Sequence, residues 1–102
     1  MYAYDPIANI PENLTHLVLG GETHMWSEQT DPVNVDRMAW PRACAAAEVL
    51  WSGAKDASGK NRSHIEASPR LSDMRERLVQ MGIMAEPVHM PFCTMNGSSC
   101  AL

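Results

Sequence analysis

Trp26 and Glu28 are the two residues of this 102-residue chain whose types and spacing best suit ligand binding. They follow a short apolar run, "LVLGG", that begins at Leu17. If residues 17–28 form extended chain, side chains two positions apart project to the same side. The indole ring could then cover the apolar C–H face of a pyranose, while the carboxylate accepts hydrogen bonds of roughly 1.5–3 kcal/mol from its hydroxyl groups. The pair indicates a sugar-binding edge, and the alternatives are a packing role for Trp26 and a solvated surface position for Glu28.

The segment that carries this pair has the pattern of a buried strand. Residues 17–22 are nearly continuously apolar, which is typical of a parallel strand covered on both faces. Such a strand needs hydrogen-bonding partners along both edges. We therefore expect the partner strands to come from elsewhere in a larger protein or from further copies of this chain.

A helix is predicted over residues 40–52. Pro41 suits the first helical turn, and Gly53 follows at the end as a stop. One face of this helix is expected to pack against a sheet, and it carries Ala43, Ala47, Leu50 and Trp51.

A second helix is predicted over residues 64–82. Its apolar side chains recur at helical spacing, and Gly82 supplies the C-terminal stop. These side chains are Leu71, Met74, Leu78 and Met81. Two starts are consistent with the sequence: a cap at Ser68 before Pro69, or a start near His64 with a kink at Pro69.

Three other segments read as irregular chain: a connection over residues 1–16, a polar loop over 29–38 and a surface loop over 53–63. In the tail over residues 83–102, the stretch "CTMNGSSC" places Cys93 and Cys100 close together. They read as a small disulfide loop worth about 2 kcal/mol, the alternative being two unrelated thiols. Cys44 is expected to be a small, buried core residue.

Three acceptor sequons for N-glycosylation, at Asn13, Asn61 and Asn96, favour a secretory history. The N-terminus has neither the basic nor the apolar region of a signal peptide, so we expect a chain that has lost its front end. The net charge of -4 argues against a nucleic-acid partner. No apolar run approaches the roughly 20 residues that span a membrane. The cysteines and histidines lack the spacing of a structural zinc site, so no metal and no cofactor are expected.

Four short motifs in order resemble the C-terminal signature of the catalytic barrel of glycoside hydrolase family 20, the β-N-acetylhexosaminidases. They are Gly20-Gly21-Glu22, Trp26-Ser27-Glu28, Trp40-Pro41-Arg42-Ala43 and the stretch from Ala45 to Ser52 that contains Glu48 and Trp51. The resemblance begins near Tyr4 and covers nearly the whole chain.

The resemblance implies an α/β fold: the C-terminal portion of a (β/α)8 TIM barrel, incomplete because a full barrel needs ~250 residues. Residues 17–28 would be the last barrel strand and its loop, and residues 40–52 the last barrel helix. Residues 64–82 would form a C-terminal helix, followed by a tail, 83–102, that carries the disulfide loop between Cys93 and Cys100.

The resemblance also implies roles for individual residues. Glu28 would hydrogen-bond the outer hydroxyl groups of a terminal N-acetylhexosamine, and Trp26 would form part of the apolar wall of that pocket. Glu22, Arg42 and Glu48 match family positions that we assign to structural ion pairs under the sheet.

The family cleaves terminal N-acetylhexosamine residues from glycans or chitin oligomers by substrate-assisted, retaining catalysis, in which an adjacent Asp-Glu pair orients the acetamido group and protonates the leaving oxygen. This chain contains no Asp-Glu dipeptide, so it holds no catalytic residue and we expect it to be inactive alone. The resemblance implies a parent protein that is secreted or is vacuolar or lysosomal. The remainder of a hexosaminidase barrel or a second copy of the chain would then be its partner. The rival hypotheses are a non-catalytic sugar-binding module and a truncated product that pairs with a hexosaminidase subunit.

Overall fold

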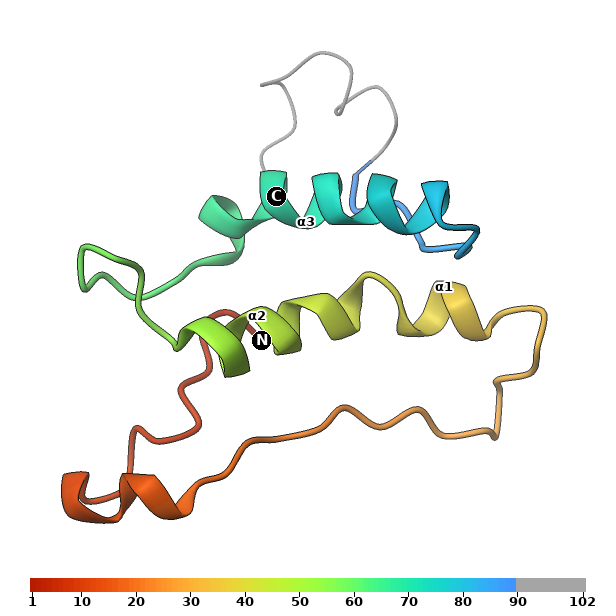
Figure 1. Cartoon of the computed structure of the whole chain (residues 1–102). Helices are drawn as coiled ribbons and strands as arrows, with labels where there is room; N and C mark the ends of the chain where they lie inside the picture. The colour runs from red at the N-terminus through yellow and green to blue at the C-terminus, as the bar shows by residue number, and fades with distance from the viewer. Residues whose placement is uncertain (90–102) are drawn as a thin grey trace.

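The computed structural model describes residues 1–89, which form three α-helices and one 3-10 helix (Figure 1). In chain order these are η1 (Glu12–Leu17), α1 (Val35–Ala39), α2 (Arg42–Ser52) and α3 (His64–Gln80). Helix α2 lies between α3 and the elongated segment 18–26, which run along its two sides (Figure 1). Cys93, Cys100 and Asn96 lie outside the described residues. The disulfide between the two cysteines and the glycosylation of Asn96 therefore stay predictions.

The predicted strand is absent from the described part of the chain. Residues 18–26 carry neither strand nor helix, and the β-structure of residues 1–89 is limited to one antiparallel bridge between Lys55 and Asn61. A strand is defined by hydrogen bonds to a neighbouring strand, and residues 1–89 offer no such neighbour to segment 18–26. The prediction of an α/β fold is therefore corrected for these residues, which are helical and irregular.

Helix α2 confirms the predicted helix but buries a different face. Pro41 precedes its first residue, and Gly53, at φ 81°, ends it with an N–H that donates to the Val49 carbonyl. The buried residues are Ala45, Ala46 and Val49, whereas Ala47, Leu50 and Trp51 of the predicted face are exposed. This part of the helix is apolar nearly all round, so the partner helix α3 decides which side is covered.

Helix α3 starts at His64 and continues through Pro69, as the second of the two predicted starts had it. Its N-cap is Ser63, whose Oγ accepts a 3.2 Å hydrogen bond from the Glu66 N–H. Ser68 does not cap a helix; its hydroxyl instead hydrogen-bonds the Nε2 of His89.

The C-terminal end of α3 is a Schellman motif. Gly82, at φ 87°, donates to the Val79 carbonyl, and the next N–H, that of Ile83, donates to the Leu78 carbonyl. Of the predicted apolar stripe, Leu78 is buried and Leu71 and Met74 are half-buried, but Met81 is 64 % exposed. Met81 lies beyond the last helical residue, which takes it off the packed face.

The core is small and joins the N-terminus to the helix pair. Its buried members are Tyr2, Ala45, Val49 and Ala67, with Leu71 packed against them. Segment 83–86 is hydrogen-bonded to α1 and to the residue that follows it: the Met84 N–H donates to Asp36 and the Glu86 N–H donates to the Trp40 carbonyl.

Within residues 1–89, no helix combines the length and the apolar character that a bilayer crossing requires.

Candidate functional site

Trp26 and Glu28 both lie at the surface, where segment 18–26 ends. The Trp26 residue is 75 % exposed, and Glu28 is exposed within a turn that begins at Ser27. The elongated chain thus ends at Trp26. It does not continue to Glu28, although the argument from alternating side chains assumed that it would. That the two side chains face the same way stays a prediction.

The loop after Glu28 is held by reciprocal hydrogen bonds between Asp31 and Asn34. Asp31 Oδ1 accepts from the N–H groups of Val33 and Asn34 at 2.8 and 3.3 Å, and Asn34 Oδ1 accepts from the Asp31 N–H at 2.9 Å. The Asn34 side chain also donates to the carbonyl of Gln29 at 2.8 Å. These contacts fix the turn that carries Glu28 to the start of α1, a helix that lies in the predicted loop 29–38.

Behind Trp26, segment 18–26 lies directly against α2. A Cβ built on Gly21 would be 3.3 Å from Leu50 Cδ2, so the glycine permits a close approach to the helix. Farther along the segment, Glu22 was predicted to form an ion pair. Its Oε1 lies 3.1 Å from the Nε2 of His24, and both side chains are largely exposed. Such an exposed pair contributes little to stability. Arg42 makes no ion pair within residues 1–89.

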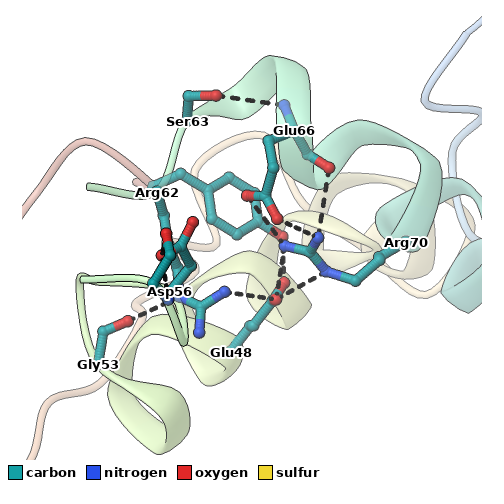
Figure 2. Close-up of polar contacts among 9 residues, drawn as sticks. Glu48, Gly53, Asp56, Arg62, Ser63, Glu66 and Arg70 are labelled. Atoms are coloured by element: carbon teal, nitrogen blue, oxygen red, sulfur yellow. Dashed lines mark hydrogen bonds and ion pairs between the residues drawn. The ribbon is translucent and has the colours of Figure 1, made fainter. Parts of the chain in front are cut away.

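The densest polar cluster centres on Glu48, on the α2 side that faces α3 (Figure 2). Glu48 Oε2 accepts a 2.8 Å hydrogen bond from the Tyr2 hydroxyl. Its Oε1 accepts from Arg70 at 2.8 Å and lies 3.5 Å from Arg62, whose side chain is only 12 % exposed. The Glu48 carboxylate thus joins the N-terminus, the α2–α3 loop and α3. This confirms the structural ion pairing predicted for Glu48. The prediction placed this pairing under a sheet, and the described residues contain no sheet.

Arg70 extends this cluster along α3. Its guanidinium also pairs with Glu66 at 2.5 Å, one helical turn earlier, and lies between the two carboxylates (Figure 2). The hydrogen bond with Glu66 raises the pKa of Arg70, and the same contact lowers the pKa of Glu66. Burial, followed by the hydrogen bond to Glu48, raises the pKa of the Tyr2 phenol. The charged side chains of this cluster and the Tyr2 hydroxyl are all paired with one another. The cluster therefore positions the helices and leaves none of these groups free for catalysis.

Sequence reasoning selected Glu48 from this cluster and missed the other members, which are Tyr2, Arg62, Glu66 and Arg70. Arg70 lies on α3 and reaches Glu48 across the α2–α3 contact. The spacing of Glu66 and Arg70, four apart, was the available signal for part of this arrangement. Nothing in the sequence pointed to Tyr2, because its partner is 46 positions away.

Two surface hollows lie elsewhere than at Trp26 and Glu28. One, of about 290 Å³, opens beside the Glu48 cluster and includes the half-buried Cys44, whose thiol pKa is raised by burial. The other, of about 470 Å³, lies where the end of α3 meets residues 82–87. Within residues 1–89, no three His, Cys, Asp or Glu side chains gather as metal ligands would. Trp26 and Glu28 therefore form an open edge outside both hollows.

Residues 1–54, which include this edge, its loop and all of α2, match the model of glycosyl hydrolase family 20, catalytic domain. The chain belongs to glycosyl hydrolase family 20. This confirms the resemblance carried by the four motifs, all of which fall inside the matched residues.

Relatives within family 20 align beyond the matched region. A beta-hexosaminidase of Arthroderma benhamiae is 52 % identical over the whole of this chain, and one of Emericella nidulans is 37 % identical over the whole chain. A chitooligosaccharidolytic beta-N-acetylglucosaminidase of Ostrinia furnacalis is 46 % identical over 81 % of it. The chain spans only 16 %, 17 % and 13 % of these three proteins, so it corresponds to a small part of a family 20 enzyme.

Proposed function

We propose that this chain is the C-terminal part of the catalytic domain of a β-N-acetylhexosaminidase and supplies one edge of its sugar pocket. The observation that carries the proposal is the alignment of the whole chain, at 52 % identity, with a beta-hexosaminidase. The exposure of Trp26 and Glu28 supports it, because a binding edge must be accessible to its ligand.

In the proposed pocket, the Glu28 carboxylate accepts hydrogen bonds from the outer hydroxyl groups of a terminal N-acetylhexosamine. No described residue is within ion-pair distance of this carboxylate, so its oxygens stay available for a ligand. The Trp26 indole covers the apolar face of the sugar ring. Charge-assisted hydrogen bonds of this kind contribute roughly 1.5–3 kcal/mol each.

The proposed chemistry depends on chain that these 102 residues do not contain. In the parent reaction the acetamido oxygen of the substrate attacks its own anomeric carbon, and an Asp-Glu pair orients the acetamido group and protonates the leaving oxygen. The present chain lacks that pair, so within the complete barrel it helps to hold the sugar while residues from the rest of the barrel cleave it. The remaining barrel strands pair with segment 18–26 and cover the neighbouring apolar side chains Leu19 and Trp51, which are 96 % and 93 % exposed. The parent protein is secreted or is vacuolar or lysosomal, and it acts on N-acetylhexosamine-containing glycans or chitin oligomers.

A chimera tests the proposed role of the chain. Residues 1–102 replace the aligned part of the Arthroderma benhamiae relative, and the product is assayed on an aryl N-acetylglucosaminide. We expect hydrolysis within an order of magnitude of the parent enzyme. A chimera that shows the parent's cooperative unfolding and yet has no turnover would contradict the proposal.

A second candidate is a non-catalytic sugar-binding module, favoured by the accessibility of Trp26 and Glu28 without any further chain. Titration of the isolated chain with N-acetylglucosamine distinguishes the two. Millimolar or tighter binding favours the module. Absence of binding favours an edge that works only within a complete barrel.

A further inference from the structure

The loop between α2 and α3, residues 53–63, is closed at its base by its own hydrogen bonds. Lys55 and Asn61 form an antiparallel bridge, and the Arg62 N–H donates to the Ala54 carbonyl at 2.9 Å. At its tip, Asp56 Oδ1 accepts from the hydroxyl and N–H of Ser58 and from the Lys60 N–H. The loop thus has a shape that is defined by contacts among its own residues.

Asn61 lies at the base of this loop, inside the sequon Asn61-Arg62-Ser63, and its side chain is exposed. The next side chain, Arg62, is only 12 % exposed; it donates to the Gly53 carbonyl at 2.9 Å and faces Glu48. Successive side chains of bridged, extended chain point to opposite sides. Since Arg62 points inward, Asn61 points outward, and its amide can carry a bulky group without displacing the Glu48 cluster.

We propose that Asn61 is the site of an N-linked glycan on the outer side of the α2–α3 loop. The proposal rests on the secretory origin in the proposed function. The donor is an oligosaccharide joined through pyrophosphate to a lipid carrier. The Asn61 Nδ2 forms a bond to the anomeric carbon and loses a proton to the transferase, and the bond from that carbon to the pyrophosphate oxygen breaks with its electron pair.

The position of the loop is compatible with the proposed pocket. The loop and the turn after Trp26 lie at opposite ends of the α1–α2 pair (Figure 1), so a glycan on Asn61 would stay clear of the bound sugar. Asn13, the other described sequon, is exposed within η1, just before segment 18–26. A glycan there would adjoin the chain that must cover this segment, which makes Asn61 the better-placed acceptor.

Expression of the full chain behind a cleavable secretory leader in a eukaryotic host tests the proposal. After release by a glycan amidase, which hydrolyses the side-chain amide and converts the linked asparagine to aspartate in heavy-oxygen water, we expect the label at Asn61 by peptide mass spectrometry. Leader cleavage shows that the chain entered the secretory compartment, whether or not it is exported. A cleaved chain whose Asn61 peptide is unmodified would overturn the proposal.

Three variants separate the glycan from the helix cap. Asn61→Gln and Ser63→Asp should each lose the mass of one glycan, although Asp retains an N-cap for α3. Ser63→Thr keeps both the sequon and the cap and should retain the glycan. Removal of the glycan from the native protein without denaturant is also expected; removal only after unfolding would contradict an outward Asn61. These readouts do not depend on hydrolysis, so an inactive chimera would leave them standing.

Discussion

The Tyr2 hydroxyl lies 2.8 Å from Glu48 Oε2, although the two residues are 46 positions apart. This contact fastens the N-terminus to α2, and the same carboxylate binds Arg70 of α3 at 2.8 Å. Three separate segments are therefore fixed around one carboxylate, on the side of α2 away from segment 18–26. Within residues 1–89, α2 is packed more completely on the side that faces α3 than on the side that faces segment 18–26, where Leu50 is 42 % exposed.

The first prediction concerns Glu48. Glu48→Gln removes the charge that faces Arg62 and Arg70 and should lower the free energy of unfolding by about 2 kcal/mol. Tyr2→Phe removes one hydrogen bond to a charged group and should cost about 1 kcal/mol. Urea unfolding followed by helical circular dichroism measures both. Glu76→Gln is the matched control, because among the described residues Glu76 pairs with its neighbour Arg75 alone. A Glu48 effect no larger than this control would refute the role of the cluster.

Acid should weaken the α2–α3 connection. Arg70 lowers the pKa of Glu66, and the hydroxyl of Ser58, followed by the Lys60 N–H, lowers the pKa of Asp56. The folded state thus binds these protons less readily than the unfolded state. Their contribution to stability is present above the ordinary carboxyl pKa of about 4 and is lost as the pH falls below it. We expect the double variant Asp56→Asn, Glu66→Gln to show a flatter dependence of stability on pH in this range. An unchanged acid limb would contradict the assignment.

The sequence was sufficient to predict helices α2 and α3, but it did not predict η1, α1 or the residues that the helices bury. Gly53 and Gly82 end their helices as predicted, because each supplies a positive φ at a helix terminus. The buried face of α2 could not be predicted, since alanines and aliphatic residues surround most of this helix and only α3 distinguishes its sides. Segment 18–26 has the composition of a strand, yet a strand depends on partners that no local pattern contains.

The candidate site stays a prediction, and its residues were selected for a different reason. Trp26 and Glu28 were selected by their chemistry and by a family motif, and both are accessible at the surface. Their relative orientation was inferred from extended geometry, and the turn at Ser27 removes that basis. The Asp31–Asn34 contacts that fix this turn arise between side chains and backbone three residues apart, a signal that was present in the loop composition but was not used.

Trp51 should behave differently in the lone chain and in a complete barrel. Its residue is 93 % exposed, so Trp51→Ser should change the stability of the isolated chain by no more than about 0.5 kcal/mol. In the chimera with the Arthroderma benhamiae relative we expect the rest of the barrel to cover the indole, and the same substitution should then cost about 3 kcal/mol. Ile65→Ser, on α3 across α2 from segment 18–26, is the control and should have a small effect in both proteins. Equal, small effects of Trp51→Ser in both would show that this face stays uncovered.

The most direct test of the central claim is the hydrolysis of an aryl N-acetylglucosaminide by the chimera carrying Glu28→Gln. Loss of a charge-assisted hydrogen bond of roughly 1.5–3 kcal/mol predicts a kcat/KM lower by about 10- to 150-fold. Glu12→Gln, an exposed glutamate of η1, is the matched control and should leave kcat/KM unchanged. If Glu28→Gln left both kcat and KM at the values of the unsubstituted chimera, Glu28 would not hold the sugar and the account would be wrong.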